Sequence, residues 1–107
     1  MLKRHLGRRG FDVRVVHSGE AALALLNRQK PCCAILDEMM PGISGLDVVR
    51  QVRSSPKIND LAIFFYSGSF DPEKQKDAAA MGVKQWWVKG VAALPEVLDH
   101  VAEYCGG

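Results

Sequence analysis

The sequence predicts an α/β domain whose parallel sheet is doubly wound, with helices on both faces. Short apolar runs alternate along the chain with amphipathic stretches, and short loops join them. Strands and helices that alternate in this way form right-handed units and build a parallel sheet. Three successive apolar runs are each followed by a polar residue, Asp37, Ser67 and Lys89. Because the carboxyl ends of parallel strands meet at one edge of the sheet, we expect these three side chains to converge there.

Three elements are expected before the first buried strand. Residues 2–9 carry leucines at helical spacing and stop at a glycine, as the end of a helix does. Residues 12–17 alternate in hydrophobicity like a strand near a sheet edge. Ser18 is placed to cap a helix over 19–28, and the apolar run 32–36 predicts a strand buried on both faces.

Five further elements complete the pattern. A helix over 44–53 begins at a serine or glycine and carries an inward stripe of Leu and Val. The run 61–66 predicts the next buried strand, and an Asp-Pro pair opens a helix over 71–81. The last strand is expected at 85–88 and the last helix at 95–104, which begins with proline. The two adjacent tryptophans of that strand must point to opposite faces, so one of them belongs to the core.

Composition limits the function. The 107 residues suffice for a single domain over 1–107, and a hydrophobic share of 48% with 24% charged residues is typical of globular proteins. No apolar stretch is long enough for a membrane span and no signal-peptide pattern occurs, so we expect a cytoplasmic protein. The net charge of +2 is scattered along the chain, which argues against direct binding of nucleic acid.

The cysteines and histidines give no metal-binding pattern. Cys32 and Cys33 are adjacent in a predicted strand and Cys105 lies in the tail, an odd count without ligand spacing. We expect reduced thiols in a reducing compartment, with cross-linking of two chains through Cys105 as a lesser alternative. The histidines share no element and no ligand spacing: His5, His17 and His100.

The residues after the strand 32–36 carry a family resemblance. Residues 35–46 contain Asp37, then Met-Pro, then Gly, and this string resembles the phosphorylation loop of bacterial response-regulator receiver domains. Ser67 lies 30 residues and Lys89 52 residues beyond that aspartate, which are the offsets of the family's switch hydroxyl and its lysine. Trp86, three residues before the lysine, matches the family's aromatic position. The resemblance covers essentially the whole chain.

The resemblance implies a role for each of these residues in two-component signalling. Asp37 would accept a phosphoryl group from the phosphohistidine of a histidine kinase or a phosphotransfer protein, which makes the chain a signalling domain and not an enzyme. Met39 would offer its backbone carbonyl, and Asp37 its carboxylate, to a Mg²⁺ ion. Ser67 and Lys89 would contact phosphoryl oxygens, and Trp86 would turn inward when Ser67 moves.

Two departures from the family pattern are evident. Receiver domains begin with a strand that ends in two acidic residues, which bind Mg²⁺ together with the phosphorylated aspartate. The 36 residues before Asp37 are too few to include that strand, so the chain starts within the first helix, and both strand and acidic pair are absent. A late start codon, a truncation or a degenerate receiver would each account for this, and Mg²⁺ binding should be weakened or lost. Gly90 replaces the family's proline, so the peptide after Lys89 should be trans.

Other interpretations of the same residues remain open. A degenerate receiver could act as a phosphate-independent interaction or dimerisation module. A hydrolase of the haloacid dehalogenase type is disfavoured because Met39 occupies the position of its second acid. Glu38 is adjacent to Asp37, but neighbours in an extended chain diverge, so a loop position or a partner contact is expected for it and not an acid–base pair.

The missing strand also bears on assembly. In the family's strand order, 2-1-3-4-5, it is the central strand, and its loss leaves backbone groups unpaired. Either 12–17 moves next to 32–36, or two chains pair so that one fills the vacancy of the other. The alternation of residues 12–17 suits an edge better than a centre, so we favour a homodimer through residues 1–17.

Overall fold

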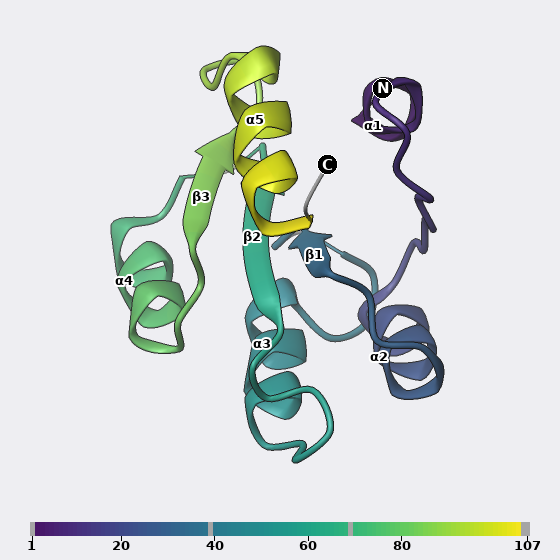
Figure 1. The fold of residues 1–107 in the computed structure, drawn as a ribbon. Helices are drawn as coiled ribbons and strands as arrows, with labels where there is room; N and C mark the ends of the chain where they lie inside the picture. Colours follow the sequence, from purple (N-terminus) through teal and green to yellow (C-terminus); the bar gives the residue numbers. More distant parts are fainter. Residues whose placement is uncertain (1, 39, 69, 106–107) are drawn as a thin grey trace.

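The computed structural model describes residues 2–38, 40–68 and 70–105. Within these residues, three parallel strands alternate with helices, and two further helices precede the first strand (Figure 1). In chain order the elements are α1 (Leu2–Arg8), α2 (Gly19–Arg28), β1 (Cys33–Leu36), α3 (Gly45–Arg53), β2 (Ala62–Ser67), α4 (Pro72–Ala80), β3 (Gln85–Val88) and α5 (Leu94–Cys105). All but one of the expected elements are therefore present, with ends shifted by a residue or two. None of these helices combines the length and the hydrophobicity that a membrane crossing requires.

The sheet has the order β1-β2-β3 and is parallel throughout. Leu36 pairs with Phe65, and Ser67 pairs with Val88, so the carboxyl ends of the three strands lie at the same edge. Side chains of β2 alternate between the faces: Phe65 packs with residues of α2, α3 and α4, whereas Phe64 packs with Val97 of α5. Helices therefore cover both faces, which confirms the doubly wound arrangement.

Side-chain caps set the beginnings of three helices. Ser18 accepts a hydrogen bond from the backbone N–H of Ala21, and Ser44 accepts one from Asp47. Asp71 caps α4 in the same way, and Pro72 occupies the first helical position, where it has no intrahelical partner to lose. These local signals explain why the helix starts agree with the expectation from sequence.

Arg53 at the end of α3 binds two chain segments at the edge of the sheet opposite the polar residues. Its guanidinium donates hydrogen bonds to four backbone carbonyls: Met81 at 2.7 Å, Leu61 at 2.7 Å, Asn59 at 3.0 Å and Gly82 at 3.4 Å. These carbonyls belong to the loop before β2 and to the turn after α4. One charged side chain thus fixes the entry to β2 and the turn that leads into β3.

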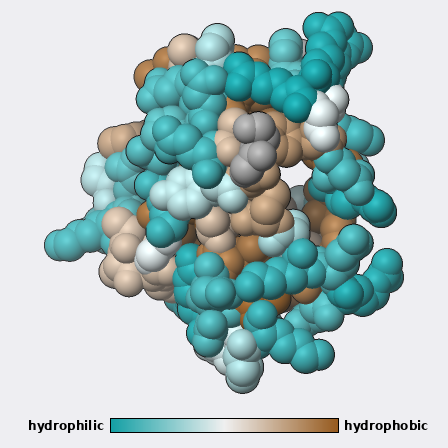
Figure 2. Space-filling view, viewed as in Figure 1, coloured by the Kyte–Doolittle hydropathy of each residue, from teal (hydrophilic) through white to brown (hydrophobic). Residues whose placement is uncertain are grey.

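The strand expected at 12–17 is not formed, and that prediction was wrong. This segment is irregular, and Val15 is half exposed, while Val13 packs against α1 and α5. Within the described residues, β1 pairs with β2 alone, and residues 12–17 do not move in beside it. A cavity of about 810 Å³ separates them; it is lined by α1, the segment 11–17, α2, β1 and α5. The space-filling view is hollowed there (Figure 2). A strand needs a neighbour to pair its backbone groups, and residues 12–17 have none within reach.

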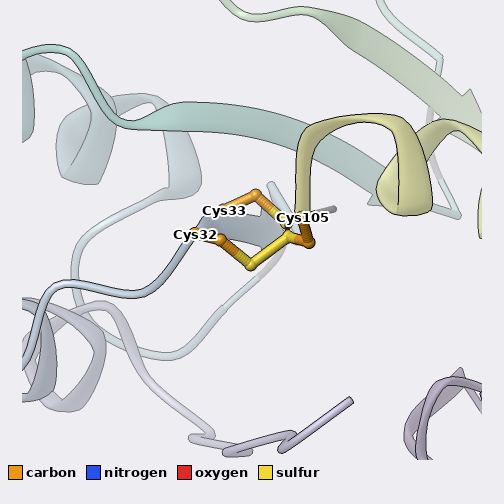
Figure 3. Close-up of side chains that lie close together, drawn as sticks. All are labelled: Cys32, Cys33 and Cys105. Atoms are coloured by element: carbon orange, nitrogen blue, oxygen red, sulfur yellow. Dashed lines mark hydrogen bonds between the residues drawn. A yellow bond between two sulfur atoms is a disulfide. The ribbon is translucent and has the colours of Figure 1, made fainter. Parts of the chain in front are cut away.

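The expectation of three reduced thiols was also wrong. Cys32 and Cys105 form a disulfide within the chain, with their Cα atoms 5.3 Å apart and a sequence separation of 73, and Cys33 is the free cysteine. The bond joins the residue before β1 to the last residue of α5 (Figure 3). No spacing in the sequence indicates that these two ends meet, because the contact depends on how α5 lies across the sheet.

Candidate functional site

The three polar residues that follow the apolar runs meet at one edge of the sheet, as the sequence predicted. Asp37 follows β1, Ser67 ends β2 and Lys89 follows β3. The Ser67 hydroxyl donates a hydrogen bond to Oδ1 of Asp37 at 3.0 Å, and the ammonium of Lys89 lies 2.9 Å from Oδ2. One carboxylate oxygen therefore has a donor from β2, and the other has a donor from the residue after β3.

The site rests on a buried residue, and its two charged side chains are partly exposed to solvent. Ser67 is fully buried, and its backbone carbonyl accepts a hydrogen bond from the N–H of Lys89 at 2.8 Å, which fixes the two residues relative to each other. The side chains of Asp37 and Lys89 are 29% and 47% exposed. An ion pair this exposed contributes only about 0–1 kcal/mol to stability. Its importance is to hold an ammonium group beside a carboxylate that a reactant can approach from solvent.

Glycine at position 45 lets α3 begin directly beside Asp37. A Cβ at that position would lie 2.7 Å from the backbone oxygen of Asp37 and 2.9 Å from the ring of Phe65. Both neighbours are fixed, one as backbone and one in the core, so any larger residue would displace the loop that carries the carboxylate.

Glu38 is turned away from Asp37 and has a structural position that the sequence did not reveal. It is only 4% exposed. Its Oε1 accepts a hydrogen bond from the backbone N–H of Leu46 at 3.0 Å, in the first turn of α3, and its Oε2 lies 3.2 Å from Nζ of Lys74 on α4. Glu38 thus joins the loop after Asp37 to two helices. The expectation that it is no acid–base partner is consistent with this geometry, and Glu38 lies in a loop as expected, but its burial and its contacts with α3 and α4 were not expected.

The two tryptophans of β3 lie on opposite faces, as expected. Trp87 is buried and stacks on Phe64, with ring centroids 5.1 Å apart. Trp86 is partly buried, stacks on Phe65 with centroids 4.5 Å apart, and borders a shallow pocket against α4. Trp86 is therefore the tryptophan on the α4 side of the sheet, and it belongs to the strand next to that of Ser67.

Comparison with known proteins identifies the family. The family model of the response regulator receiver domain matches residues 1–102. The chain belongs to the response-regulator receiver family. Its members act in two-component signalling.

Curated relatives of this receiver domain are longer than the chain. The phosphate regulon transcriptional regulatory protein PhoB of Rhizobium meliloti is 29% identical over 101 residues, which are 94% of this chain and 44% of that protein. The response regulator MprA of Mycobacterium avium is 41% identical over 54 residues, which are 50% of this chain and 24% of that protein. The chain thus spans less than half the length of these relatives.

Solved structures agree with the fold. A putative response regulator from Chloroflexus aurantiacus has a TM-score of 0.88 at 26% identity, and the match covers 100% of this chain and 87% of that one. A response regulator receiver protein from Pseudomonas putida has a TM-score of 0.86 at 32% identity and covers 92% of this chain and 81% of that one. The three-stranded sheet with its helices is therefore a flavodoxin-like receiver fold.

Receiver domains generally bind Mg²⁺, but the described residues of this one do not fit such a site. Asp37 supplies one carboxylate, and both oxygens of Glu38 are engaged with α3 and α4. The backbone carbonyl of Met39, the other expected ligand, lies outside the described residues. Over 2–38, 40–68 and 70–105, three metal-ligating side chains come together only in the cysteine cluster. Mg²⁺ prefers six oxygens in octahedral geometry, and one carboxylate leaves most of them to water.

The loop after Lys89 differs from the family pattern in its backbone. Gly90 has a φ of +82°, and no cis peptide bond occurs in the part of the chain that the structure describes. Proline holds φ near −65° and cannot adopt this conformation. The peptide after Lys89 is trans, as expected, and a proline at position 90 would not fit the observed φ.

Proposed function

We propose that Asp37 accepts a phosphoryl group from the phosphohistidine of a histidine kinase or a phosphotransfer protein. The observation that supports this most directly is the contact of both carboxylate oxygens with donors, Ser67 at 3.0 Å and Lys89 at 2.9 Å, at an open edge of the sheet. Such donors suit a group whose negative charge is spread over three oxygens.

The transfer is a nucleophilic displacement at phosphorus. One oxygen of Asp37 forms the new P–O bond, and the P–N bond to the donor imidazole breaks, with its electron pair leaving on the imidazole nitrogen. Lys89 neutralises one phosphoryl oxygen as the ammonium shifts from the carboxylate to the phosphate. Ser67 gives its hydroxyl hydrogen bond to a second oxygen. The product is an acyl phosphate on the protein, so the chain acts as an acceptor of the group and not as an enzyme that turns over.

The proposed output of this step is a change in packing around Trp86. When the Ser67 hydroxyl leaves Oδ1 of Asp37 for the phosphoryl group, the end of β2 moves toward the new charge. Trp86 stacks on Phe65 in the same strand pair, next to α4. A local charge change is in this way coupled to the surface formed by α4, β3 and α5, which a partner can recognise.

A metal ion is expected to bind weakly to this chain. With one carboxylate at the site, the dissociation constant for Mg²⁺ should be in the millimolar range or weaker, which corresponds to about 4 kcal/mol or less. Trp86 lies two residues before the end of β3 and should report binding by fluorescence. Saturation at micromolar Mg²⁺ would mean that other acidic residues replace the expected ligands.

Intact-mass measurement tests the phosphoacceptor. The chain is incubated with a small phosphodonor and Mg²⁺, and one added phosphoryl group is expected. Asp37→Asn should abolish it. The matched control is Asp77→Asn, the same Asp-to-Asn change on the exposed face of α4, which should leave the labelling unchanged. Labelling that survives Asp37→Asn would overturn the assignment.

The structure also offers support for a second function, a phosphate-independent module that dimerises. One edge of β1 faces an apolar cavity of about 810 Å³, with α1 and the irregular residues 11–17 on its far side. A second copy of the chain could add a strand there and pair the backbone groups that β1 presents. Light scattering at micromolar concentration should then give a dimer mass. A monomer mass at every concentration would eliminate this function. For either function we propose a cytoplasmic protein that contacts proteins and not nucleic acid.

A further inference from the structure

Three sulfur atoms lie together where the end of α5 meets the start of β1 (Figure 3). Cys32 and Cys105 form the disulfide, and the Sγ of Cys33 lies 3.4 Å from the Sγ of Cys105. All three sulfur atoms are within 4.8 Å of one another. The free thiol is therefore in contact with one of the two bonded sulfur atoms, and that atom belongs to Cys105.

We propose that Cys105 can form its disulfide with either Cys32 or Cys33, and that thiol–disulfide exchange moves the bond from Cys32 to Cys33. The Cys33 thiol loses its proton to water, and the thiolate attacks the Sγ of Cys105. The Cys33–Cys105 bond forms as the Cys32–Cys105 bond breaks, and Cys32 leaves as a thiolate that takes up a proton. The number of disulfides is unchanged, so the step needs neither an oxidant nor a reductant.

The surroundings of the three residues favour exchange toward the interior. Cys32 is exposed, whereas Cys33 and Cys105 are partly buried and pack against the cluster of Leu6, Leu98 and Val101. Exchange therefore moves the disulfide into apolar surroundings and leaves the thiolate at the surface, where water solvates it. Burial raises the pKa of the Cys33 thiol to about 11, so few molecules hold the attacking thiolate at neutral pH. Exchange should accordingly be slow at pH 7 and faster in mild alkali.

The exchanged form has a property that the original form lacks. It presents a free thiol at Cys32, on the surface, where a low-molecular-weight disulfide or a cysteine of another protein can form a mixed disulfide. It also moves the covalent attachment of α5 by one residue, from the residue before β1 to the first residue of β1. This site is distinct from Asp37, which lies at the other end of the strand, so it operates whether or not the aspartate is phosphorylated.

Alkylation of the oxidised, unmutated chain distinguishes the two forms. The protein is equilibrated at pH 9 with a trace of a small thiol, then treated with iodoacetamide under non-reducing conditions, and fragmentation of the labelled peptide locates the adduct between the adjacent cysteines. With exchange, most of the label is expected on Cys32, because that thiol is exposed. Label confined to Cys33 after equilibration would overturn the proposal.

Two single variants test the geometry without relying on reaction rates. In Cys32→Ser, oxidised glutathione should close a Cys33–Cys105 disulfide, seen as a loss of two hydrogens from the intact mass with the protein still monomeric. Cys33→Ser is the matched control, which should keep the Cys32–Cys105 bond and take up no label. If Cys32→Ser retains two free thiols under conditions that fully oxidise Cys33→Ser, the two-partner arrangement is wrong.

Discussion

Replacing Glu38 with alanine should destabilise the protein by about 2–4 kcal/mol. The variant leaves the N–H of Leu46 without its acceptor in a buried position, and such a loss costs about 1–3 kcal/mol, with charged acceptors at the upper end. The negative charge at the start of α3 contributes about 0.3–1 kcal/mol through the helix dipole. The pair with Lys74 adds about 0–1 kcal/mol because that side chain is 43% exposed. These contributions are not independent, so the expected loss of about 2–4 kcal/mol is smaller than the sum of their upper limits.

Urea unfolding followed by circular dichroism measures this loss. Glu38→Gln keeps an oxygen for Leu46 and should lose about half as much, whereas Lys74→Met removes only the ion pair and should cost about 1 kcal/mol or less. Asp77→Ala on the exposed face of α4 is the matched control, within about 0.5 kcal/mol of the unmutated chain. If Glu38→Gln is as damaging as Glu38→Ala, the hydrogen bond to Leu46 is not what Glu38 contributes, and the reasoning fails.

Three further outcomes are expected. Arg53→Ala, which removes the donor to four carbonyls, should lower the free energy of urea unfolding by about 1.5–3 kcal/mol, and Arg53→Lys should recover less than half of that loss. Equal stability of the unmutated chain and the two variants would show that water replaces the guanidinium. Reduction of the Cys32–Cys105 bond should lower the unfolding free energy by about 4 kcal/mol, because the bond spans 73 residues, and an unchanged midpoint in dithiothreitol would contradict this. In the double variant Cys32→Ser, Cys105→Ser, the raised pKa of Cys33 keeps its thiol neutral at pH 9, so the alkylation rate should be low at pH 9 and rise up to about pH 11. An alkylation rate that levels off near pH 9 would mean that burial does not raise the pKa of Cys33.

The sequence predicted the site because the relevant signals do not depend on tertiary detail. Asp37, Ser67 and Lys89 each follow an apolar run, and a parallel arrangement brings the ends of such runs together wherever the helices lie. The helix caps at Ser18 and Asp71 are likewise contacts between residues two or three positions apart. Interactions of this range are contained in the local sequence.

The features that the sequence did not predict depend on contacts between segments that lie far apart in the sequence. Residues 12–17 have the alternation of a strand, but a strand forms only beside another, and its neighbour would have to occupy the cavity next to β1. The burial of Glu38 depends on the approach of Lys74 from α4. The disulfide depends on where α5 ends, 73 residues after Cys32. Pattern and spacing carry no information about these approaches.

Strand β1 connects the two chemical sites of the molecule. Within the described residues it is four residues long and pairs on one side only, so the sheet restrains it less than it restrains β2, which pairs on both sides. The disulfide fastens its first end to α5 through Cys32, and the loop at its other end carries Asp37, about 16 Å away for five extended residues. Glu38 then holds that loop to α3 and α4. A covalent bond and a buried carboxylate thus restrain the two ends of a strand that pairs on one side only in the described part of the chain, and we expect the position of Asp37 relative to Ser67 and Lys89 to depend on both.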